Sequence, residues 1–278
     1  MKAQGATEYL VIVGVVLMIA LVCVALLVWP TGTTKDAKKQ QTDIHFKIGE
    51  MGTQVQGYPQ LVQGLVGYWK FDEGSGAAAT DSRGGNTGTL ISSPSWVSGK
   101  SGTALQFNGA DSGNYVQTSL DIGDSNEKTF AGWFRFNTNR TYMVMVLDGI
   151  NFDSNKYCGL ITNGATVYLY QSYNGGASTF ATSTPNLNYQ GGGWHHVAGV
   201  IDRPGNSLKI YLDGALNVTY SDASIGSSTF YNPTGTVRIG GGTAGYGFNG
   251  TIDEVMVFNR ALSADEVRLL YENPGYPQ

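Results

Sequence analysis

Nine short segments of the chain are rich in β-branched and aromatic residues, and turn-forming pairs separate many of them. The segments are 66–71, 104–107, 129–136, 142–147, 166–170, 194–201, 208–212, 237–239 and 251–258. Asn-Gly and Asp-Gly pairs, which tolerate positive φ and close hairpins, occur at 108–109, 148–149, 163–164, 174–175 and 213–214. Many short strands with no alternation of strands and helices predict an all-β fold, a two-sheet antiparallel β-sandwich or jelly roll.

The composition agrees with such a fold and excludes one class of partner. The chain has 278 residues with 39 glycines, and charged residues make up only 14%, well below the usual quarter. A net charge of −4 without a basic stripe cannot neutralise a phosphate backbone, so no nucleic-acid partner is expected. Cys23 and Cys158 lie in very different segments and are not expected to form a disulfide.

Ahead of the strands, 21 consecutive residues from Tyr9 to Trp29 carry no charge, which is long enough for a membrane-spanning helix. A secretory signal peptide has a shorter apolar region and a small-residue cleavage site, and neither is found here. A plain signal anchor is the second alternative. Three lysines at 35, 38 and 39 follow the run. For a signal anchor, the positive-inside rule would therefore leave the large C-terminal part in the cytoplasm, which conflicts with the rest of the sequence.

The residues before this run favour a third alternative for the nature of the apolar segment. The sequence KAQGATE of residues 2–8 places the carboxylate of Glu8 against the apolar segment, where an ionisable group usually has a function. The stretch resembles the class III signal peptide of archaeal type IV pilins. The resemblance implies a leader of residues 1–3, a cut by prepilin peptidase between Ala3 and Gln4, and a helix over residues 4–30 that begins membrane-bound.

That resemblance also implies self-association. The new amino terminus at Gln4 of one subunit would offset the charge of Glu8 in a neighbour as the helices bundle, since a buried charge costs much less with a partner. Small residues such as Gly14 and Ala20 permit close helix packing. The alternative is a simple membrane tether, in which Glu8 lies at the headgroup level and has no role in assembly.

Pro30 and Gly32 end or kink this helix. Residues 31–60 are interpreted as a linker that is partly helical at most, and residues 61–278 as the sandwich. One helix is predicted near the C-terminus, because Ser263 and Glu266 form a capping box ahead of apolar residues at helical spacing. This helix is expected to cover one end or edge of the sandwich.

Four sequence blocks within residues 65–263 are characteristic of one family. They are LVGYWKFDEG at 65–74, ALQFNG at 104–109, GWHHVAG at 193–199 and GTIDEVMVFNRALS at 250–263. In this order they resemble the concanavalin A-like, laminin-G-like domains. The resemblance implies a two-sheet jelly roll, often with a structural calcium ion and often with a surface that binds carbohydrate or protein.

The acidic residues do not form the pattern of a glycosidase, which needs two carboxylates facing one cleft. Asp253 and Glu254 are adjacent on a strand and are expected to point to opposite faces, as are Asp72 and Glu73. The sequence therefore predicts a protein that is not an enzyme. The pair His195-His196 has no further His or Cys at ligand spacing, so packing or strand-surface roles are expected.

Calcium is the cofactor that the laminin-G-like resemblance implies, tying the first strand to the last with Asp253 as its first candidate ligand. Asp72, Asp111 and the carbonyl of Gly109 offer further hard oxygen ligands near strand ends. The alternative is that these acids only cap turns, and an insertion at 108–114 interrupts the family pattern around Asp111.

Three Asn-x-Thr sequons, at Asn139, Asn217 and Asn249, are candidate N-glycosylation sites of an exported domain. A Thr-rich chain also contains such triplets by chance. Aromatic residues can stack on sugar rings or simply stabilise sheets through cross-strand pairs. The candidates are Tyr168, Tyr170, Tyr173, Tyr231 and Tyr246.

Together these features predict a pilin-like subunit or adhesin that displays a laminin-G-like domain on the cell surface and binds a glycan or another surface ligand. A membrane-anchored binding module that does not polymerise is the first alternative, and a surface glycan hydrolase is the second.

Overall fold

The computed structural model describes residues 59–110, 113–138, 141–149, 157–164, 166–172, 178–183, 192–227, 235–242 and 245–276. All of them lie in the second of two units, residues 57–278. The predicted leader and N-terminal helix, with Ala3, Gln4 and Glu8, fall outside these ranges. Within the ranges, no helix combines the length and apolar character that a membrane crossing requires.

Sixteen strands make up the described unit, and each of the nine predicted segments overlaps one of them. Eight strands belong to sheet A: β1 (Leu65–Trp69), β4 (Ser95–Ser98), β5 (Thr103–Asn108), β7 (Glu127–Phe136), β12 (His195–Asp202), β13 (Ser207–Leu212), β14 (Ala215–Ser221) and β16 (Asn249–Phe258). Eight belong to sheet B: β2 (Ala78–Ala79), β3 (Gly88–Ile91), β6 (Tyr115–Gln117), β8 (Met143–Gly149), β9 (Tyr157–Asn163), β10 (Thr166–Ser172), β11 (Ser178–Thr182) and β15 (Val237–Ile239).

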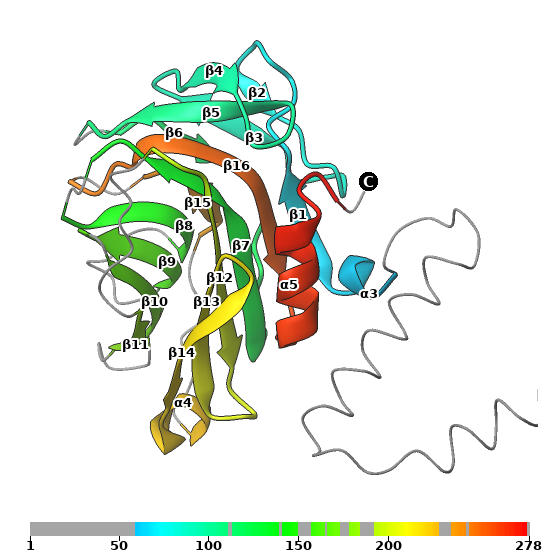
Figure 1. Ribbon diagram of the computed structural model, residues 1–278, viewed down its shortest axis with the longest axis vertical. Helices are drawn as coiled ribbons and strands as arrows, with labels where there is room; N and C mark the ends of the chain where they lie inside the picture. Colours follow the sequence, from blue (N-terminus) through cyan, green and yellow to red (C-terminus); the bar gives the residue numbers. More distant parts are fainter. Residues whose placement is uncertain are drawn as a thin grey trace, which may run out of the picture. The chain divides into compact units, whose positions relative to one another are not determined.

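The two sheets pack face to face as an antiparallel sandwich (Figure 1). Sheet A has the order β14-β13-β12-β7-β16-β5-β4, and β1 pairs with the second half of β16. Sheet B has the order β11-β10-β9-β8-β15-β6-β3-β2. Several neighbours are far apart in sequence, as expected for a jelly roll, and the predicted fold class is confirmed for this unit.

The main core lies between the sheets and is made by side chains at alternate strand positions. In β10, Val167 and Leu169 are fully buried in this core, whereas Tyr168 and Tyr170, at the alternate positions, are only half-buried. The pleat therefore places the two tyrosines on the outer face of sheet B.

A charged pair is also buried between the sheets. Nζ of Lys128, on β7, lies 2.8 Å from Oδ2 of Asp148, on β8, and the two side chains are 0% and 1% exposed. The Sγ atom of Cys158, on β9, lies 3.6 Å from the same carboxylate oxygen. Cys158 is thus a buried free thiol, and burial raises its pKa well above the ordinary value.

The outer face of sheet A carries a second apolar cluster, covered by two helices. Helix α5 (Ala264–Glu272) buries Val267, Leu269 and Leu270, and the short helix α3 (Pro59–Val62) precedes β1. The predicted capping box is confirmed, because Ser263 and Glu266 bond each other's backbone amides. The helix covers a face of the sandwich and not an end or edge, because Ala131, Val200, Met256 and Phe258 make that face apolar. A third helix, α4 (Ala223–Ser227), follows β14.

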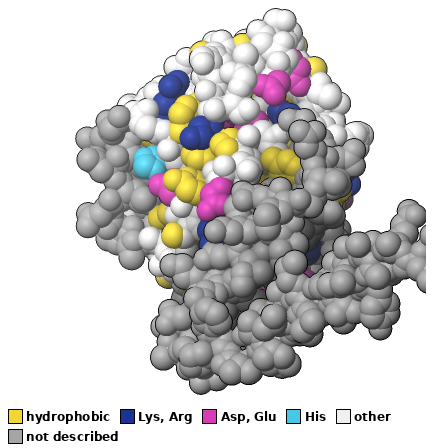
Figure 2. All heavy atoms as spheres, turned by 45° about the vertical axis from the view of Figure 1, so that its right-hand side comes forward, with side chains coloured by type: hydrophobic (Ala, Val, Ile, Leu, Met, Phe, Trp, Pro, Cys, Tyr) yellow, Lys and Arg dark blue, Asp and Glu magenta, His cyan; other side chains and the backbone are white. Residues whose placement is uncertain are grey.

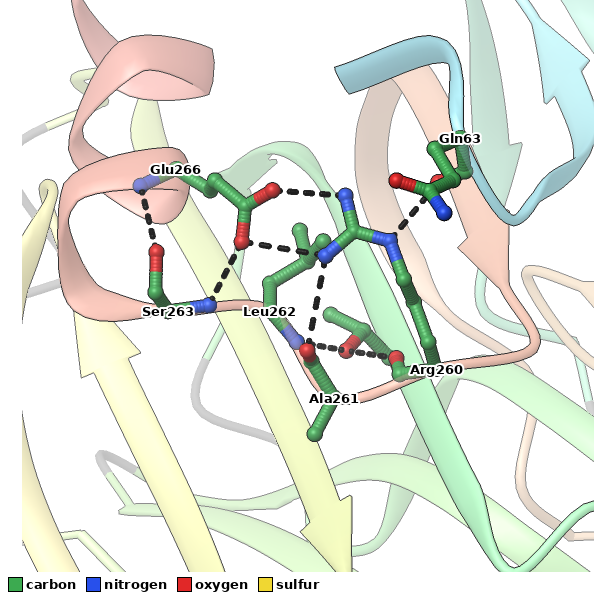
Figure 3. Close-up of polar contacts among 7 residues, drawn as sticks. Gln63, Arg260, Ala261, Leu262, Ser263 and Glu266 are labelled. Atoms are coloured by element: carbon green, nitrogen blue, oxygen red, sulfur yellow. Dashed lines mark hydrogen bonds and ion pairs between the residues drawn. The ribbon is translucent and has the colours of Figure 1, made fainter. Parts of the chain in front are cut away.

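Arg260 connects the start of α5 to the start of the domain (Figure 3). Its guanidinium donates to both carboxylate oxygens of Glu266, at 3.0 and 2.6 Å, and its Nε donates to the carbonyl of Gln63 at 2.7 Å. A bidentate Arg–carboxylate pair combines charge with fixed geometry. Arg260 therefore fixes α5 against the turn that leads into β1.

Surface charge is mixed in sign. Figure 2 shows acidic, basic and hydrophobic side chains interspersed over the described part of one face, with no large area of one charge.

Candidate functional site

Six aromatic side chains gather on the outer face of sheet B and are named here the aromatic face. They come from the start of β8, from β9, β10 and β11, and from the loop before β16, and are Tyr142, Tyr157, Tyr168, Tyr170, Phe180 and Tyr246. Tyr142 and Phe180 are 40% and 43% exposed, respectively. Tyr168, Tyr170 and Tyr246 are half-buried, and Tyr157 is buried beneath its neighbours at 6% exposure. Exposed large apolar side chains that lie together mark an interaction surface more often than a lone exposed residue does.

The register of three strands brings these rings together. Tyr170 lies opposite Phe180 across β10 and β11 and opposite Gly159 across β10 and β9. The centroid of the Tyr170 ring is 5.1 Å from that of Phe180 and 5.8 Å from that of Tyr168. Because these rings support one another, each is held in a defined orientation.

A second pair of rings extends the surface. The centroids of Tyr142 and Tyr246 lie 6.0 Å apart, and the carbonyl of Tyr246 accepts a hydrogen bond from the amide of Val144 on β8. Burial, together with the neighbouring tyrosines, raises the pKa of Tyr170 to about 12. At neutral pH the face is an uncharged surface of ring carbons with phenol groups that donate or accept hydrogen bonds.

Sequence reasoning identified three members of this face, Tyr168, Tyr170 and Tyr246. The candidates Tyr173 and Tyr231 lie outside the described residues. Three members were missed, Tyr142, Tyr157 and Phe180. Phe180 lies in the segment Ser-Thr-Phe-Ala-Thr, which shows no alternation, and its position opposite Tyr170 depends on a strand register that one sequence does not reveal.

Two adjacent carboxyl groups are buried in β16. Both oxygens of Asp253 accept backbone hydrogen bonds, Oδ2 from Lys100 and Ser101 at 2.8 and 3.1 Å and Oδ1 from Glu254 at 3.0 Å. The Glu254 carboxylate accepts a hydrogen bond from the hydroxyl of Tyr68 on β1. Asp253 is 0% exposed and Glu254 is 2% exposed, so neither carboxyl group is accessible to a polysaccharide.

The prediction that these two acids point to opposite faces is wrong. A β-bulge shifts the register between Asp253 and Met256, and Glu254 has a φ of 53°. Asp253 lies opposite Trp133, whose ring stacks on Tyr271 of α5, and Tyr68 belongs to the cluster beneath that helix. Both carboxyl groups therefore lie on the outer side of sheet A, because a bulge breaks the alternation of a regular strand.

Burial makes both groups weak acids. It raises the pKa of Asp253 to about 8, an effect that the neighbouring Glu254 increases and the backbone amides oppose. It raises the pKa of Glu254 to about 7, against the hydrogen bond from Tyr68 and the charge of Lys70. The folded protein thus keeps protons that the unfolded chain, with carboxyl pKa values near 4, has already lost.

We therefore expect the domain to lose stability as pH rises from 6.5 to 8.5. In this range the folded state binds more protons than the unfolded state, so each step up in pH favours unfolding. The check is the midpoint of thermal unfolding at several pH values, for the wild type and for Glu254→Gln, which keeps a polar group beside Tyr68. The variant should show a shallower fall; a midpoint that rises with pH in the wild type contradicts the assignment.

Of the four residues predicted to bind calcium, the structure describes Asp72, Gly109 and Asp253. Asp72 is exposed and accepts a hydrogen bond from the amide of Thr103 at 3.1 Å, while the oxygens of Asp253 already bind backbone amides. Gly109 directly follows Asn108, the last residue of β5, which pairs with Asn249 at the start of β16. Asp111 lies outside the described ranges. Those ranges hold no group of three acids, histidines or cysteines that suits a metal. Calcium stays a prediction of the family resemblance.

The two histidines occupy different environments. His196 is buried against Trp133, at a ring distance of 5.4 Å, and burial lowers its pKa to about 4. Nδ1 of His195 is 3.0 Å from a carboxylate oxygen of Asp213, at the β13–β14 turn. These are the packing and strand-surface roles predicted for the pair.

Two of the three sequon asparagines lie within the described residues. Asn217 is half-buried in the edge strand β14, and Asn249 is half-buried at the start of β16, where its side chain packs against Gly109. Asn139 lies outside the described residues. N-glycosylation stays a prediction at all three.

Two antiparallel sheets packed face to face, with a cluster of aromatic rings on one outer face, place this unit in the class of jelly-roll domains. Residues 108–268 match the family described as the concanavalin A-like lectin/glucanases superfamily, a laminin-G domain type. The chain belongs to this superfamily, and the laminin-G-like resemblance predicted from the sequence is confirmed. No curated protein matches the sequence.

Solved structures share the fold at low identity. Domain 4 of AbnA, a GH43 extracellular arabinanase from Geobacillus stearothermophilus solved with arabinotriose, is 19% identical over 74% of this chain and 98% of its own, with a TM-score of 0.58. The binding domain of paraclostridial mosquitocidal protein 1 is 14% identical over 76% of this chain and 52% of its own, with a TM-score of 0.58.

A third similar structure is the binding domain of botulinum neurotoxin DC, solved in complex with rat synaptotagmin II. It is 12% identical over 75% of this chain and 51% of its own, with a TM-score of 0.59. The chain thus spans about half the length of the two toxin binding domains. At these identities the likeness shows the fold.

Proposed function

We propose that the sandwich is a glycan-binding module and that the aromatic face is its binding surface. The observation that carries the proposal is the group of mutually supporting rings on β9, β10 and β11. Sugar rings present apolar C–H faces and hydroxyl edges, and Tyr side chains offer an apolar ring and a polar tip at low entropic cost. The face therefore matches both parts of a sugar.

The relatives support a ligand of this kind without identifying it. The arabinanase domain was solved with arabinotriose, and a neurotoxin binding domain with synaptotagmin, so the fold accepts a sugar in one case and a protein in another. We favour the sugar here because Tyr170 and Phe180 lie opposite each other across β10 and β11 and further rings lie beside Tyr170, an arrangement suited to stacking on a sugar unit.

We propose that this module binds without catalysing a reaction. The paired acids Asp253 and Glu254 are buried under the loop at Lys100 and Ser101 and hydrogen-bonded, so they lack the open cleft that glycoside hydrolysis requires. The check is an assay for reducing ends released from a panel of polysaccharides by the purified full-length protein. Sustained release would support the hydrolase alternative instead.

We further propose that the N-terminal segment displays the module on the cell surface as a pilin-like subunit. Glu8, adjacent to the uncharged run, carries this part. Glu8→Gln is expected to abolish recovery of the protein in filaments sheared from the surface, because the buried carboxylate would no longer pair with a neighbouring amino terminus. Mass spectrometry of the sheared protein should show a chain that begins at Gln4. A Glu8→Gln protein that still forms filaments, or a chain that begins at Met1, would favour the membrane-anchor alternative.

Removing one ring should weaken glycan binding by at least tenfold. Tyr170→Ala and Phe180→Ala each remove a contact surface at the centre of the face, whereas Tyr170→Phe keeps the ring and should lose less. Binding is measured on a panel of immobilised arabino-, gluco-, galacto- and manno-oligosaccharides. The matched control is Tyr220→Ala, since Tyr220 is 38% exposed on β14 of the other sheet. Equal binding by Tyr170→Ala and the wild type would refute the assignment.

A further inference from the structure

Two positively charged side chains lie over tryptophan rings on the outer face of sheet A, beyond the C-terminal end of α5. Tyr271, in the last turn of α5, stacks on Trp133 of β7 with 5.5 Å between the ring centroids. Two residues further along β7 is Arg135, and its chain neighbours Phe134 and Phe136 both pack in the core between the sheets. The alternation of the strand therefore turns Arg135 outward, on the same face as Trp133 and about 7 Å along the strand from it.

The guanidinium of Arg135 is held by neutral groups. Its Nη2 donates to the hydroxyl of Thr251 on β16 at 3.1 Å, and its Cζ lies 5.2 Å from the ring centroid of Trp194, which directly precedes β12. In the part of the chain that the structure describes, Arg135 forms no ion pair with an acid, and its Nε and Nη1 are not buried. A hydroxyl and a ring thus orient the guanidinium, while its charge and most of its five N–H donors stay open to solvent.

Lys100 supplies the second positive charge. It is an exposed residue of the turn between β4 and β5, and its Nζ lies 4.1 Å from the ring centroid of Trp133. The two acids around this turn bind backbone amides: Asp253 is 0% exposed and accepts from Lys100, and Asp72 accepts from Thr103. Among the described residues neither acid forms an ion pair with the Lys100 ammonium, so this charge is also open to a ligand.

Exposed hydrogen-bonding side chains continue the row that starts at Arg135. Thr251 lies opposite Arg135 on one side and opposite Gln106 of β5 on the other, and Ser95 of β4 lies opposite Gln106. Residues directly opposite each other share one face of a sheet. Thr251 is buried, but its hydroxyl holds the guanidinium, so Gln106 is about one strand spacing, or 5 Å, from the charge. Gln106 and Ser95 are both exposed.

We infer that this part of sheet A is a second binding site, which takes an acidic oligosaccharide through its carboxylate or sulfate groups. The guanidinium of Arg135 would pair with one anionic group, because its rigid array of N–H donors matches such a group geometrically. Lys100 would attract a second anionic group, and the exposed amide of Gln106 and hydroxyl of Ser95 suit a ligand rich in hydroxyl groups.

The site is independent of the aromatic face, which lies on the other sheet. The chain carries a net charge of −4, so the protein as a whole does not attract a polyanion. Binding of an acidic sugar therefore has to depend on a local group of positive charges, and Arg135 and Lys100 form such a group.

The test compares charged and neutral ligands on the full-length protein by calorimetry, at low and high salt. Tetragalacturonic acid is paired with its methyl ester, and sulfated maltotetraose with maltotetraose, so that the pairs distinguish a carboxylate from a sulfate. The wild type should prefer the acidic member of at least one pair by about tenfold or more, because charge-assisted hydrogen bonds are the stronger ones. Salt should reduce the preference. Equal affinity within both pairs, or equally tight binding of tetraglutamate, overturns the inference.

Variants test the two charges separately. Arg135→Gln should lower the affinity for the acidic ligand by about tenfold and Lys100→Gln by about threefold, because arginine offers paired donors and lysine a mobile point charge. Lys100 lies in an exposed turn, so its replacement is informative even if Arg135→Gln lowers stability. The matched control is Arg268→Gln, an arginine on α5 whose side chain is 44% exposed and already pairs with two acids of that helix; it should keep the preference.

Two results with these variants would overturn the inference. The first is an unchanged preference in a folded Arg135→Gln or Lys100→Gln protein. The second is loss of the preference in Tyr170→Ala, which would place the acidic ligand on the aromatic face instead.

Discussion

Lys128→Met is expected to destabilise the domain by about 3–5 kcal/mol, because it leaves the carboxylate of Asp148 buried between the sheets without its cation. The Lys128–Asp148 distance of 2.8 Å and exposures of 0% and 1% make this pair almost fully desolvated. Replacing both residues, as in Lys128→Met with Asp148→Leu, should restore the wild-type free energy of unfolding or exceed it, since a matched apolar pair carries no desolvation cost.

Denaturant unfolding of the full-length protein measures both effects. The control is Lys209→Met, which removes a pair at 3.4 Å whose side chains are 29% and 20% exposed. A pair with this access to water is worth about 1 kcal/mol or less. If Lys128→Met costs no more than Lys209→Met, or if the double variant is as unstable as the single one, the buried pair does not act as described.

Gly159→Ala is expected to disrupt the aromatic face and the sheet beneath it together. Gly159, on β9, has a φ of 154°, and a Cβ there would lie 2.2 Å from the carbonyl oxygen of Val146. The obstacle is backbone of the paired strand β8, which cannot move without breaking the β8–β9 pairing at its register shift. A cost of at least about 2 kcal/mol follows from such strain. Tyr170 lies directly opposite Gly159, so glycan binding should fall as well.

Thermal unfolding and the oligosaccharide panel check this second result. Gly193→Ala is the control, because a Cβ there meets no atom closer than 4.0 Å and its φ is not positive. The control should unfold and bind as the wild type does. A Gly159→Ala protein with unchanged stability would show that the β8–β9 bulge adapts to a side chain.

The sequence predicted those parts of the fold that depend on residues close together in the chain, such as a helix cap or a tight turn. The capping box at Ser263 and Glu266 begins a helix where expected, and the Asp213-Gly214 pair closes a hairpin with φ values of 48° and 77°. Nine strands were predicted, and seven were missed. Of these, β2, β3, β4 and β6 have only two to four residues, too few to show a period, whereas β9, β11 and β14 have five to seven residues and were still missed.

The sites were harder to predict because they depend on register. Nothing in the sequence marks the bulge at Glu254, yet that bulge brings two neighbouring carboxyl groups to one side of β16. Phe180 and Tyr170 meet because β10 and β11 pair with one particular offset. A shift of one residue would turn Phe180 to the opposite face. Which residues share a surface is therefore decided by long-range pairing.

The strict alternation in β10 also bears on how such a module can diversify. Val167 and Leu169 pack the core, while Tyr168 and Tyr170 meet the outside, so two separate residue sets on one strand serve folding and recognition. Substitutions in the outward set do not remove the core contacts of Val167 and Leu169, because the side chains of the two sets lie on opposite faces of the sheet. Under the proposed function, single replacements at 168, 170 or 180 would change the contacts to the ligand and leave the residues of the interior unchanged.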